Sequence, residues 1–286
     1  MVFESMIKPL TAVKKPWQLF FYGILIASIG VFLGYWIFRD KADLVMIFLT
    51  TFACIPLMFH AIRHEEKQDL ILQKEISMLK RHSRVLMFYT FLFLGMTFAF
   101  VIWYVVLPQD MSQTIFRQQI TTIAQINSPV QAKVVGEAVS TSLFNRIFFN
   151  NIKVMIFCIL FAFFYGAGAI FILAWNASVV AAAIGNLIKL GMAKSAAATG
   201  IAKMAAVTQT VSYSFFRYFF HGIPEMVAYM VAGLAGGIIS VAVINHDFRT
   251  ENFQKIILDA SSLLMIAIGI LFVAAVIESY LTPVLF

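Results

Sequence analysis

A small group of polar side chains stands inside a chain that is otherwise strongly apolar. Arg217, His221 and Glu225 follow one another at intervals of four residues within the stretch Phe215–Gly237. Ionisable groups at membrane depth are costly, so each is expected to have a partner or a function. We predict that three polar residues from elsewhere in the chain join this group: Asn150, Asn151 and Glu278.

Three kinds of chemistry fit these residue types. A metal or general-base site would use His221, Glu225 and Glu278, but catalytic zinc usually has more than one nitrogen or sulfur ligand. A transport pathway would use intramembrane charges beside a broken helix. In the favoured, structural interpretation Glu225 caps a helix and His221 binds a loop carbonyl, while Arg217 pairs with one of the glutamates. The chain has neither H-E-x-x-H nor G-x-S-x-G, so we predict no catalytic residue, metal site or cofactor.

Gly222 and Pro224 predict a break in the helix at this point. Proline removes a backbone donor and disfavours helical geometry at the preceding residue. Glu225 then falls in the first turn of a new helix, where the helix dipole favours a carboxylate. We therefore expect a joint between two helices here, rather than one continuous polar face.

The composition indicates a membrane protein. Of the 286 residues, 61% are hydrophobic and only 12% are charged, and the mean hydropathy is +0.88. A soluble domain carries about 25% charged residues, so lipid is the better explanation of this excess. The net charge of +7 fits cytoplasmic loops rich in Lys and Arg, and we expect no nucleic-acid partner. Cys54 and Cys158 both lie inside apolar runs and predict no disulfide framework.

The hydropathy pattern predicts an all-α, polytopic transmembrane helical bundle of about seven spans, plus one shorter segment. Asn176–Leu190 is too short to cross a bilayer at 1.5 Å per residue, which predicts a half-helix or re-entrant segment. Asn176 and Asn186 flank it and are predicted to cap its ends. The predicted spans are Trp17–Phe38, Leu44–Ile62, Leu86–Leu107, Ile152–Trp175, Val207–Phe220, Ile223–Asn245 and Ile256–Tyr280.

The same pattern divides the chain into three parts. Residues 1–62 form an N-terminal hairpin of two spans, in which Gly30 and Gly34 offer a close-packing face. Residues 63–85 form a cytoplasmic helical hairpin segment. Residues 86–286 form a five-span core, and its segment 109–151 is predicted to be amphipathic and to lie on the outer membrane surface.

The distribution of basic residues predicts which way the chain enters the membrane. With the N-terminus in the cytoplasm and seven crossings, the inner segments hold two thirds of the 21 Lys and Arg residues. Cytoplasmic loops of membrane proteins carry such an excess. We therefore predict that the N-terminus is inside and the C-terminus outside, which places the polar group of Glu225 and Glu278 toward the outer leaflet.

Four ordered motifs resemble the stage II sporulation protein M family. They are FFNNIKVMIF, FYGAGAIFILAWNASVVAAAIG, FFHGIPE and IESYLTP, and the likeness covers about Arg84–Phe286. In the family the third motif usually reads His-Gly-x-x-Glu-Leu/Ile-Pro, whereas here Pro224 precedes Glu225. The additional pair of spans within Trp17–Ile62 resembles archaeal members.

The resemblance implies a multi-pass protein of the cell (plasma) membrane without established enzymatic activity. In spore-forming bacteria the family member is similar to a membrane anchor that gathers cell-wall hydrolases. We therefore expect a scaffold or accessory subunit, with the lipid bilayer and either protein partners or further copies of itself around it. A transporter or permease-like component that uses the outer polar group is the alternative, and an intramembrane hydrolase is a less favoured one.

Overall fold

The computed structural model describes most of the chain as helix. Within the described part every regular element is helical, and this confirms the predicted all-α class. The described residues are 15–69, 82–127, 137–162, 167–195, 200–244 and 251–282.

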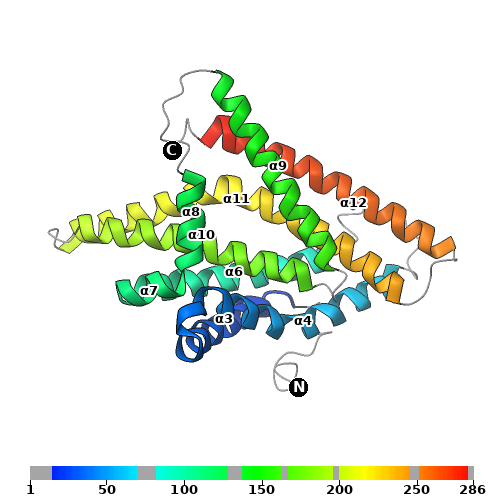
Figure 1. Ribbon diagram of the computed structural model, residues 1–286, viewed down its shortest axis with the longest axis horizontal. Coiled ribbons are helices and arrows are strands. Elements are labelled where there is room, and N and C mark those ends of the chain that lie inside the picture. The colour runs from blue at the N-terminus through cyan, green and yellow to red at the C-terminus, as the bar shows by residue number, and fades with distance from the viewer. Residues whose placement is uncertain are drawn as a thin grey trace.

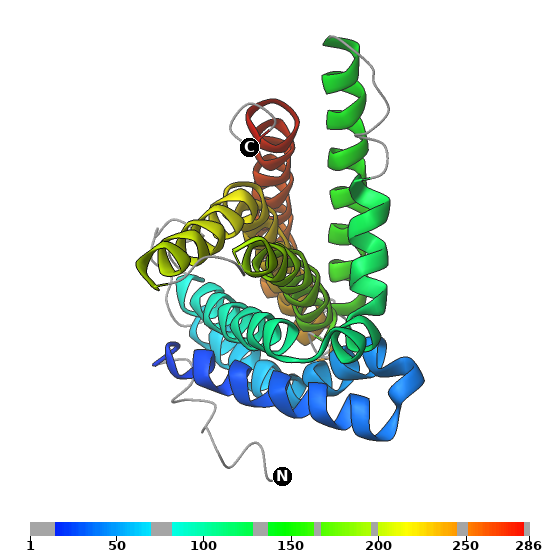
Figure 2. The same ribbon diagram turned by 90° about the vertical axis from the view of Figure 1, so that its left-hand side faces the viewer.

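The helices stack in a layered bundle (Figures 1 and 2). The N-terminal pair α3 and α4 lies on one side and α12 on the opposite side, with α6, α10 and α11 between them, while α9 runs along one flank. In chain order the elements are α3 (Gln18–Ile37), η1 (Arg39–Lys41), α4 (Ala42–Asp69), α6 (Ser83–Val106), α7 (Gln109–Ile115), α8 (Arg117–Asn127), α9 (Glu137–Ala162), α10 (Ala167–Lys194), α11 (Gly200–Ile244), α12 (Glu251–Val276) and the π-helical turn η3 (Ile277–Leu281).

The predicted number of spans is confirmed, because seven of the described helices are long and apolar enough to cross a membrane. Five of the seven agree with the predicted ones. The other two differ: the structure has Leu143–Phe161 in α9 and Ala169–Lys194 in α10. The sequence instead predicts spans at Ile152–Trp175 and Val207–Phe220.

The prediction of one span over Ile152–Trp175 is wrong, because this run belongs to two helices. Helix α9 ends at Ala162 and α10 begins at Ala167. The predicted half-helix Asn176–Leu190 is wrong for the same reason, since these residues continue α10. Its polar side chains do not interrupt the helix, because they bond within it: Asn176 Nδ2 donates to Ile172 O at 2.8 Å.

The predicted joint at Gly222–Pro224 is also wrong. Helix α11 is 45 residues long and passes through Pro224 without interruption. A proline inside a helix removes one backbone hydrogen bond. Opening the helix in lipid would leave several backbone groups unsatisfied, so a continuous helix is the less costly solution.

Small residues set the close spacing of these helices. A Cβ atom at Gly95 of α6 would lie 2.1 Å from the carbonyl oxygen of Phe20 in α3, so only glycine allows this approach. The predicted packing face in α3 is confirmed, because a Cβ at Gly30 would lie 2.9 Å from the carbonyl oxygen of Met46 in α4. The second half of α11 lies deepest, with 67% of the span Gly222–Ser240 buried.

The orientation of the chain across the membrane stays a prediction. The span order of the structure moves Lys189, Lys194 and Lys203 to the side opposite the one predicted, because α10 crosses completely. This shift removes most of the charge excess on which the orientation depends.

Candidate functional site

Glu225 stands where three helices meet. It lies in α11 near the start of the span Gly222–Ser240, and α9 and α12 both pack against α11 (Figure 1). The turn η3, which follows α12, contacts both α9 and α11. Residues from α9, α11 and η3 are thus brought to one point.

Asn151 of α9 joins two residues of α11. Its amide Nδ2 donates to Glu225 Oε1, and its amide oxygen accepts from the hydroxyl of Tyr229 at 2.9 Å. Asn151 is only 5% exposed and Tyr229 only 2%. Because both ends of the amide are used, its orientation is fixed by the network.

Glu278 of η3 completes the group. Its carboxyl group neighbours that of Glu225, and both side chains are half-buried. Two neighbouring carboxyl groups repel each other when both are ionised. π-Helical turns such as η3 occur frequently at functional sites. We call Asn151, Glu225, Tyr229 and Glu278 the acid cluster.

A comparison with protein families identifies the family of this chain. The model described as "Stage II sporulation protein M" matches residues 85–283, more than two thirds of the length. The chain belongs to this family. The match covers every residue of the acid cluster and leaves out α3 and α4. Comparisons with curated proteins and with solved structures gave no match.

In this family member the structure brings together three of the six residues predicted for the polar group: Asn151, Glu225 and Glu278. Asn150 is exposed and points away, because one residue turns the helix by about 100°. The side chains of Arg217 and His221 lie outside the described part of the chain, so the metal hypothesis that uses His221 stays a prediction.

Two predicted roles are wrong. Glu225 does not cap a helix, since α11 begins at Gly200, and the partner of its carboxylate is the Asn151 amide rather than free backbone N–H groups. Asn176 and Asn186 cap no helix either, because both lie inside α10. Asn186 is exposed, and Asn176 bonds within its own helix.

Sequence reasoning missed Tyr229, although its position gave a signal. It follows Glu225 by four residues on an unbroken helix, so the two share a face. This signal did not depend on the predicted joint, because both residues follow Pro224 in the chain.

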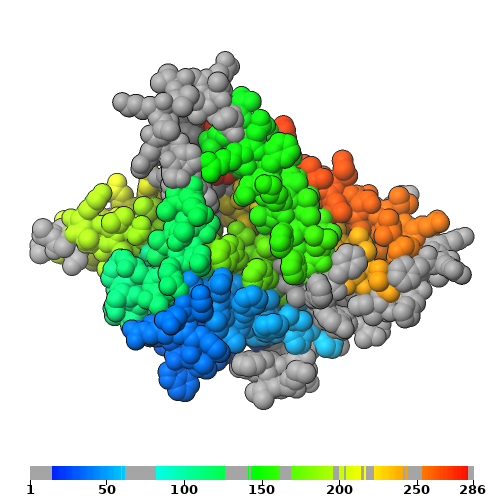
Figure 3. Space-filling model, viewed as in Figure 1, coloured from blue at the N-terminus to red at the C-terminus, as the bar shows by residue number. Residues whose placement is uncertain are grey.

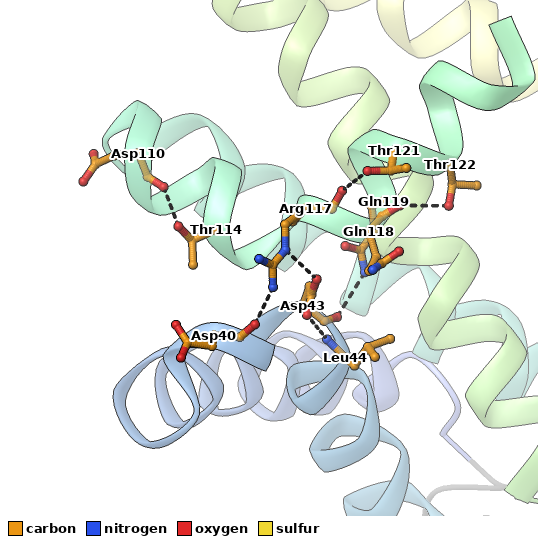
Figure 4. A network of polar contacts seen from close by, with 10 residues as sticks. All are labelled: Asp40, Asp43, Leu44, Asp110, Thr114, Arg117, Gln118, Gln119, Thr121 and Thr122. Carbon is orange, nitrogen blue, oxygen red and sulfur yellow. Dashed lines mark hydrogen bonds and ion pairs between the residues drawn. The ribbon is translucent and has the colours of Figure 1, made fainter. Parts of the chain in front are cut away.

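A second polar group joins α8 to the start of α4, as Figure 4 shows. Arg117 of α8 pairs with Asp43 of α4 at 3.4 Å between Nε and Oδ2, and also donates to the carbonyl oxygen of Asp40. Gln119 Nε2 donates to the Asp43 carbonyl oxygen at 3.2 Å. We call Asp43, Arg117 and Gln119 the Asp43 cluster. It fixes α8 against the start of α4.

Lys189 of α10 joins its helix to α6 and α7 in a similar way. Its Nζ donates to the carbonyl oxygen of Leu107 at 2.9 Å and to Ser112 Oγ at 3.0 Å. It also lies 5.3 Å from the centre of the Tyr104 ring. The ammonium group of Lys189 thus donates hydrogen bonds both to the end of α6 and to the short helix α7. This explains how a lysine is accommodated within the span Ala169–Lys194.

Proposed function

We propose that this family member is a scaffold or accessory subunit of a plasma-membrane assembly, without catalytic activity. One observation carries the proposal: the outward face of α9. Only 17% of its span Leu143–Phe161 is buried, the smallest share among the seven spans. A span that packs so little within its own chain leaves most of its surface to lipid or to another protein.

That outward face is polar along half of its length. Arg146, Asn150 and Lys153 are exposed and follow one another at helical spacing. The rings of Phe157 and Phe161 continue the same face and stack 5.3 Å apart. Figure 3 shows α9 lying across the surface of the molecule. We call these five residues the α9 stripe.

The polar members of the α9 stripe have no hydrogen bond or ion pair with any described residue. Lys153 lies near the middle of its span, where a charge facing lipid is costly. A neighbouring span with carboxylate groups would pair with Arg146 and Lys153 and remove this cost. We therefore propose an acidic transmembrane partner as the occupant of the α9 stripe, either another protein or a second copy of this chain.

Site-specific photocross-linking in native membranes tests the proposal. A photoreactive residue at Asn150 of the full chain is expected to give a discrete protein adduct. The matched control is Met265 of α12, which is 69% exposed and is expected to give lipid adducts alone. The mass of the adduct distinguishes a second copy from another protein.

Charge reversal then tests the chemistry of the partner. Lys153→Glu is expected to abolish the adduct, because it places like charges together in lipid. Lys194→Glu, at an exposed site at the end of α10, is expected to leave the adduct unchanged. Lipid adducts alone at both Asn150 and Met265 would contradict the scaffold proposal.

Transport is a second candidate, and the acid cluster favours it. Ionisable residues inside spans mark ion or proton pathways in many transporters. Vesicles that contain the full chain would then carry a proton or cation flux that Glu278→Gln abolishes. A flux equal to that of protein-free vesicles would contradict transport and would leave the scaffold proposal unaffected.

A further inference from the structure

The end of α10 and the start of α11 form a pair of antiparallel arms at one end of the bundle. The arms are in close contact, because a Cβ atom at Gly191 of α10 would overlap the side chain of Thr210 in α11. Helix α11 begins at Gly200, so at 1.5 Å per residue it extends about 15 Å beyond this contact. In Figure 1 this part of α11 extends at the left of the view beyond α7. We call residues 190–195 and 200–211 the α10–α11 hairpin.

One face of the α10–α11 hairpin carries exposed apolar side chains. Ile201, Met204, Thr208 and Val211 follow one another at intervals of three or four residues, so they lie on one side of α11. Thr210 lies on the other side, against α10, and these four residues therefore face away from α10. Ile201 is 86% exposed and Met204 is 72% exposed. Apolar surface of this kind is unfavourable in water, so we expect it to have an occupant. We call these four residues the α11 stripe.

Lipid is the occupant that the length of α11 favours. The helix has 45 residues and is about 67 Å long, whereas a bilayer with its headgroups is about 40–45 Å thick. Transmembrane helices tilt by up to about 40°, and at this tilt α11 covers about 50 Å across the bilayer. Its first turns then reach the headgroup layer, where apolar and basic side chains are both accommodated. Further along the same helix Phe216 is 49% exposed, so the surface that faces lipid continues from the α11 stripe toward the span Gly222–Ser240.

The charge of the α10–α11 hairpin favours one class of lipid. Residues 138–224 contain no Asp or Glu. Lys194 is exposed at the end of α10, and Lys203 stands in the first turn of α11, directly before Met204. Lysines beside a membrane attract anionic lipid headgroups. An element that combines two lysines with an apolar stripe, and that has no carboxylate nearby in the sequence, is complementary to an anionic lipid surface.

We propose that the α10–α11 hairpin binds anionic lipids, such as phosphatidylglycerol, in the headgroup layer of the bilayer that the chain spans. The α11 stripe contacts the upper part of the acyl chains, and Lys194 and Lys203 bind the lipid phosphate groups. The bound lipids thereby set the tilt and the depth of α11. This inference rests on neither the scaffold nor the transport proposal, because the α9 stripe and the acid cluster contain none of these residues.

Depth-dependent fluorescence quenching tests whether the α11 stripe lies in lipid. Met204→Cys, Gln209→Cys and Met265→Cys variants of the full chain are labelled with a small fluorophore and placed in vesicles that contain phosphatidylglycerol. Cys54 and Cys158 are 0% exposed, and the wild-type chain measures their background labelling. The label at Met204 should be quenched by lipids that carry a quencher near the headgroup and be protected from aqueous acrylamide. Gln209 is exposed on another side of α11, and its label should be quenched by acrylamide.

Met265 of α12 is the reference for a residue in lipid, because it is 69% exposed within a span. Its label should be quenched by lipids that carry a quencher along the acyl chain, which also shows that the variant is inserted. Equal quenching by acrylamide at Met204 and Gln209 would overturn the proposal. Protection of Met204 from both acrylamide and the lipid quenchers would overturn it too, because a second copy of the chain would then cover the α11 stripe.

Lysine variants test the preference for anionic lipids. Energy transfer from the Met204 label to headgroup-labelled phosphatidylglycerol is compared with transfer to headgroup-labelled phosphatidylcholine. Phosphatidylglycerol should be enriched around the label by about fivefold for each lysine, and Lys194→Gln/Lys203→Gln should remove the enrichment. Lys255→Gln, at an exposed site near the start of α12, is the matched control and should leave it unchanged. Equal transfer to the two lipids in the parent Met204→Cys chain, or an equal loss in Lys255→Gln, would overturn the assignment of anionic lipid to the α10–α11 hairpin.

Discussion

The acid cluster and the Asp43 cluster use the same residue types in opposite ways. In the Asp43 cluster a carboxylate faces a guanidinium group, and a buried amide holds the backbone beside it. In the acid cluster a carboxyl group faces another carboxyl group, with an amide and a phenol as the remaining partners. Opposite charges attract by themselves, whereas like groups are held together only through a proton or a cation.

The two clusters also differ in their surroundings. The Arg117 side chain is 52% exposed, so water and salt screen its pair with Asp43. The acid cluster lies within three of the seven spans, where Asn151 and Tyr229 are buried. A structural tie is expected to pair opposite charges, as the Asp43 cluster does. The acid cluster therefore stands out as the candidate for a function beyond holding helices together.

The largest effect on the free energy of unfolding is expected for Asn151→Leu. This change removes the donor to Glu225 and the acceptor of the Tyr229 hydroxyl, and leaves two poorly hydrated polar groups without their partner. The free energy of unfolding should fall by about 3 kcal/mol, since each unsatisfied group costs about 1–3 kcal/mol. Reversible unfolding in mixed micelles, followed by circular dichroism, measures this loss.

Asn150→Leu is the matched control for that measurement. Asn150 is the exposed neighbour on the same helix, and its replacement should change the free energy of unfolding by less than about 0.5 kcal/mol. Equal losses in the two variants would mean that Asn151 contributes no more than an exposed residue.

Asp43→Asn should have a smaller effect, and one that depends on salt. The change removes the ion pair with the half-exposed Arg117 and a negative charge from the first turn of α4. We expect a loss of about 1 kcal/mol at low ionic strength. At about 1 M salt, where charges are screened within about 3 Å, most of the loss should disappear.

Asp110→Asn supplies the comparison for Asp43. Asp110 also stands in the first turn of a helix, α7, but is exposed and has no ion pair among the described residues. Its replacement should cost less than about 0.5 kcal/mol. A loss at Asp43 that is unaffected by salt would show that burial of its backbone contacts, and not charge, fixes α8 to α4.

Much of the bundle can be predicted from the sequence, because lipid imposes simple rules. Long apolar runs with polar or proline-containing ends give five of the seven spans, as for α6, which ends at Val106 before Pro108. The approach of Asn151, Glu225 and Glu278 also follows from the span order. The division between α9 and α10 does not, because the run from Val154 to Trp175 carries no charged residue and no polar stop.

The unpredicted parts depend on contacts between distant segments. Asp43 and Arg117 are 74 residues apart, and nothing in either segment indicates the other. Tyr229 is one of nine tyrosines, and only the packing of α9 against α11 separates it from the rest. Pro224 misleads because a rule drawn from helices in water gives too little weight to the cost of opening a helix in lipid.

The smallest effect on stability, and the sharpest contrast between the clusters, is expected for Glu278→Gln. Neutralising one member of a like-charge pair removes no attraction, and the new amide can still donate to Glu225. The free energy of unfolding should therefore change by less than about 0.5 kcal/mol at neutral pH, and equally at low and high salt. The same unfolding measurement that detects the loss in Asp43→Asn checks this.

A loss in Glu278→Gln as large as that in Asp43→Asn, and as sensitive to salt, would reverse the interpretation of the acid cluster. It would mean that Glu278 faces a cation, and Arg217 and His221 are the nearest basic residues along α11. The double variants Glu278→Gln/Arg217→Gln and Glu278→Gln/His221→Gln would then identify the partner, because the coupling free energy differs from zero only for residues that interact. Without such a loss, Glu278 is a member of the acid cluster that stability does not require, in contrast to Asn151.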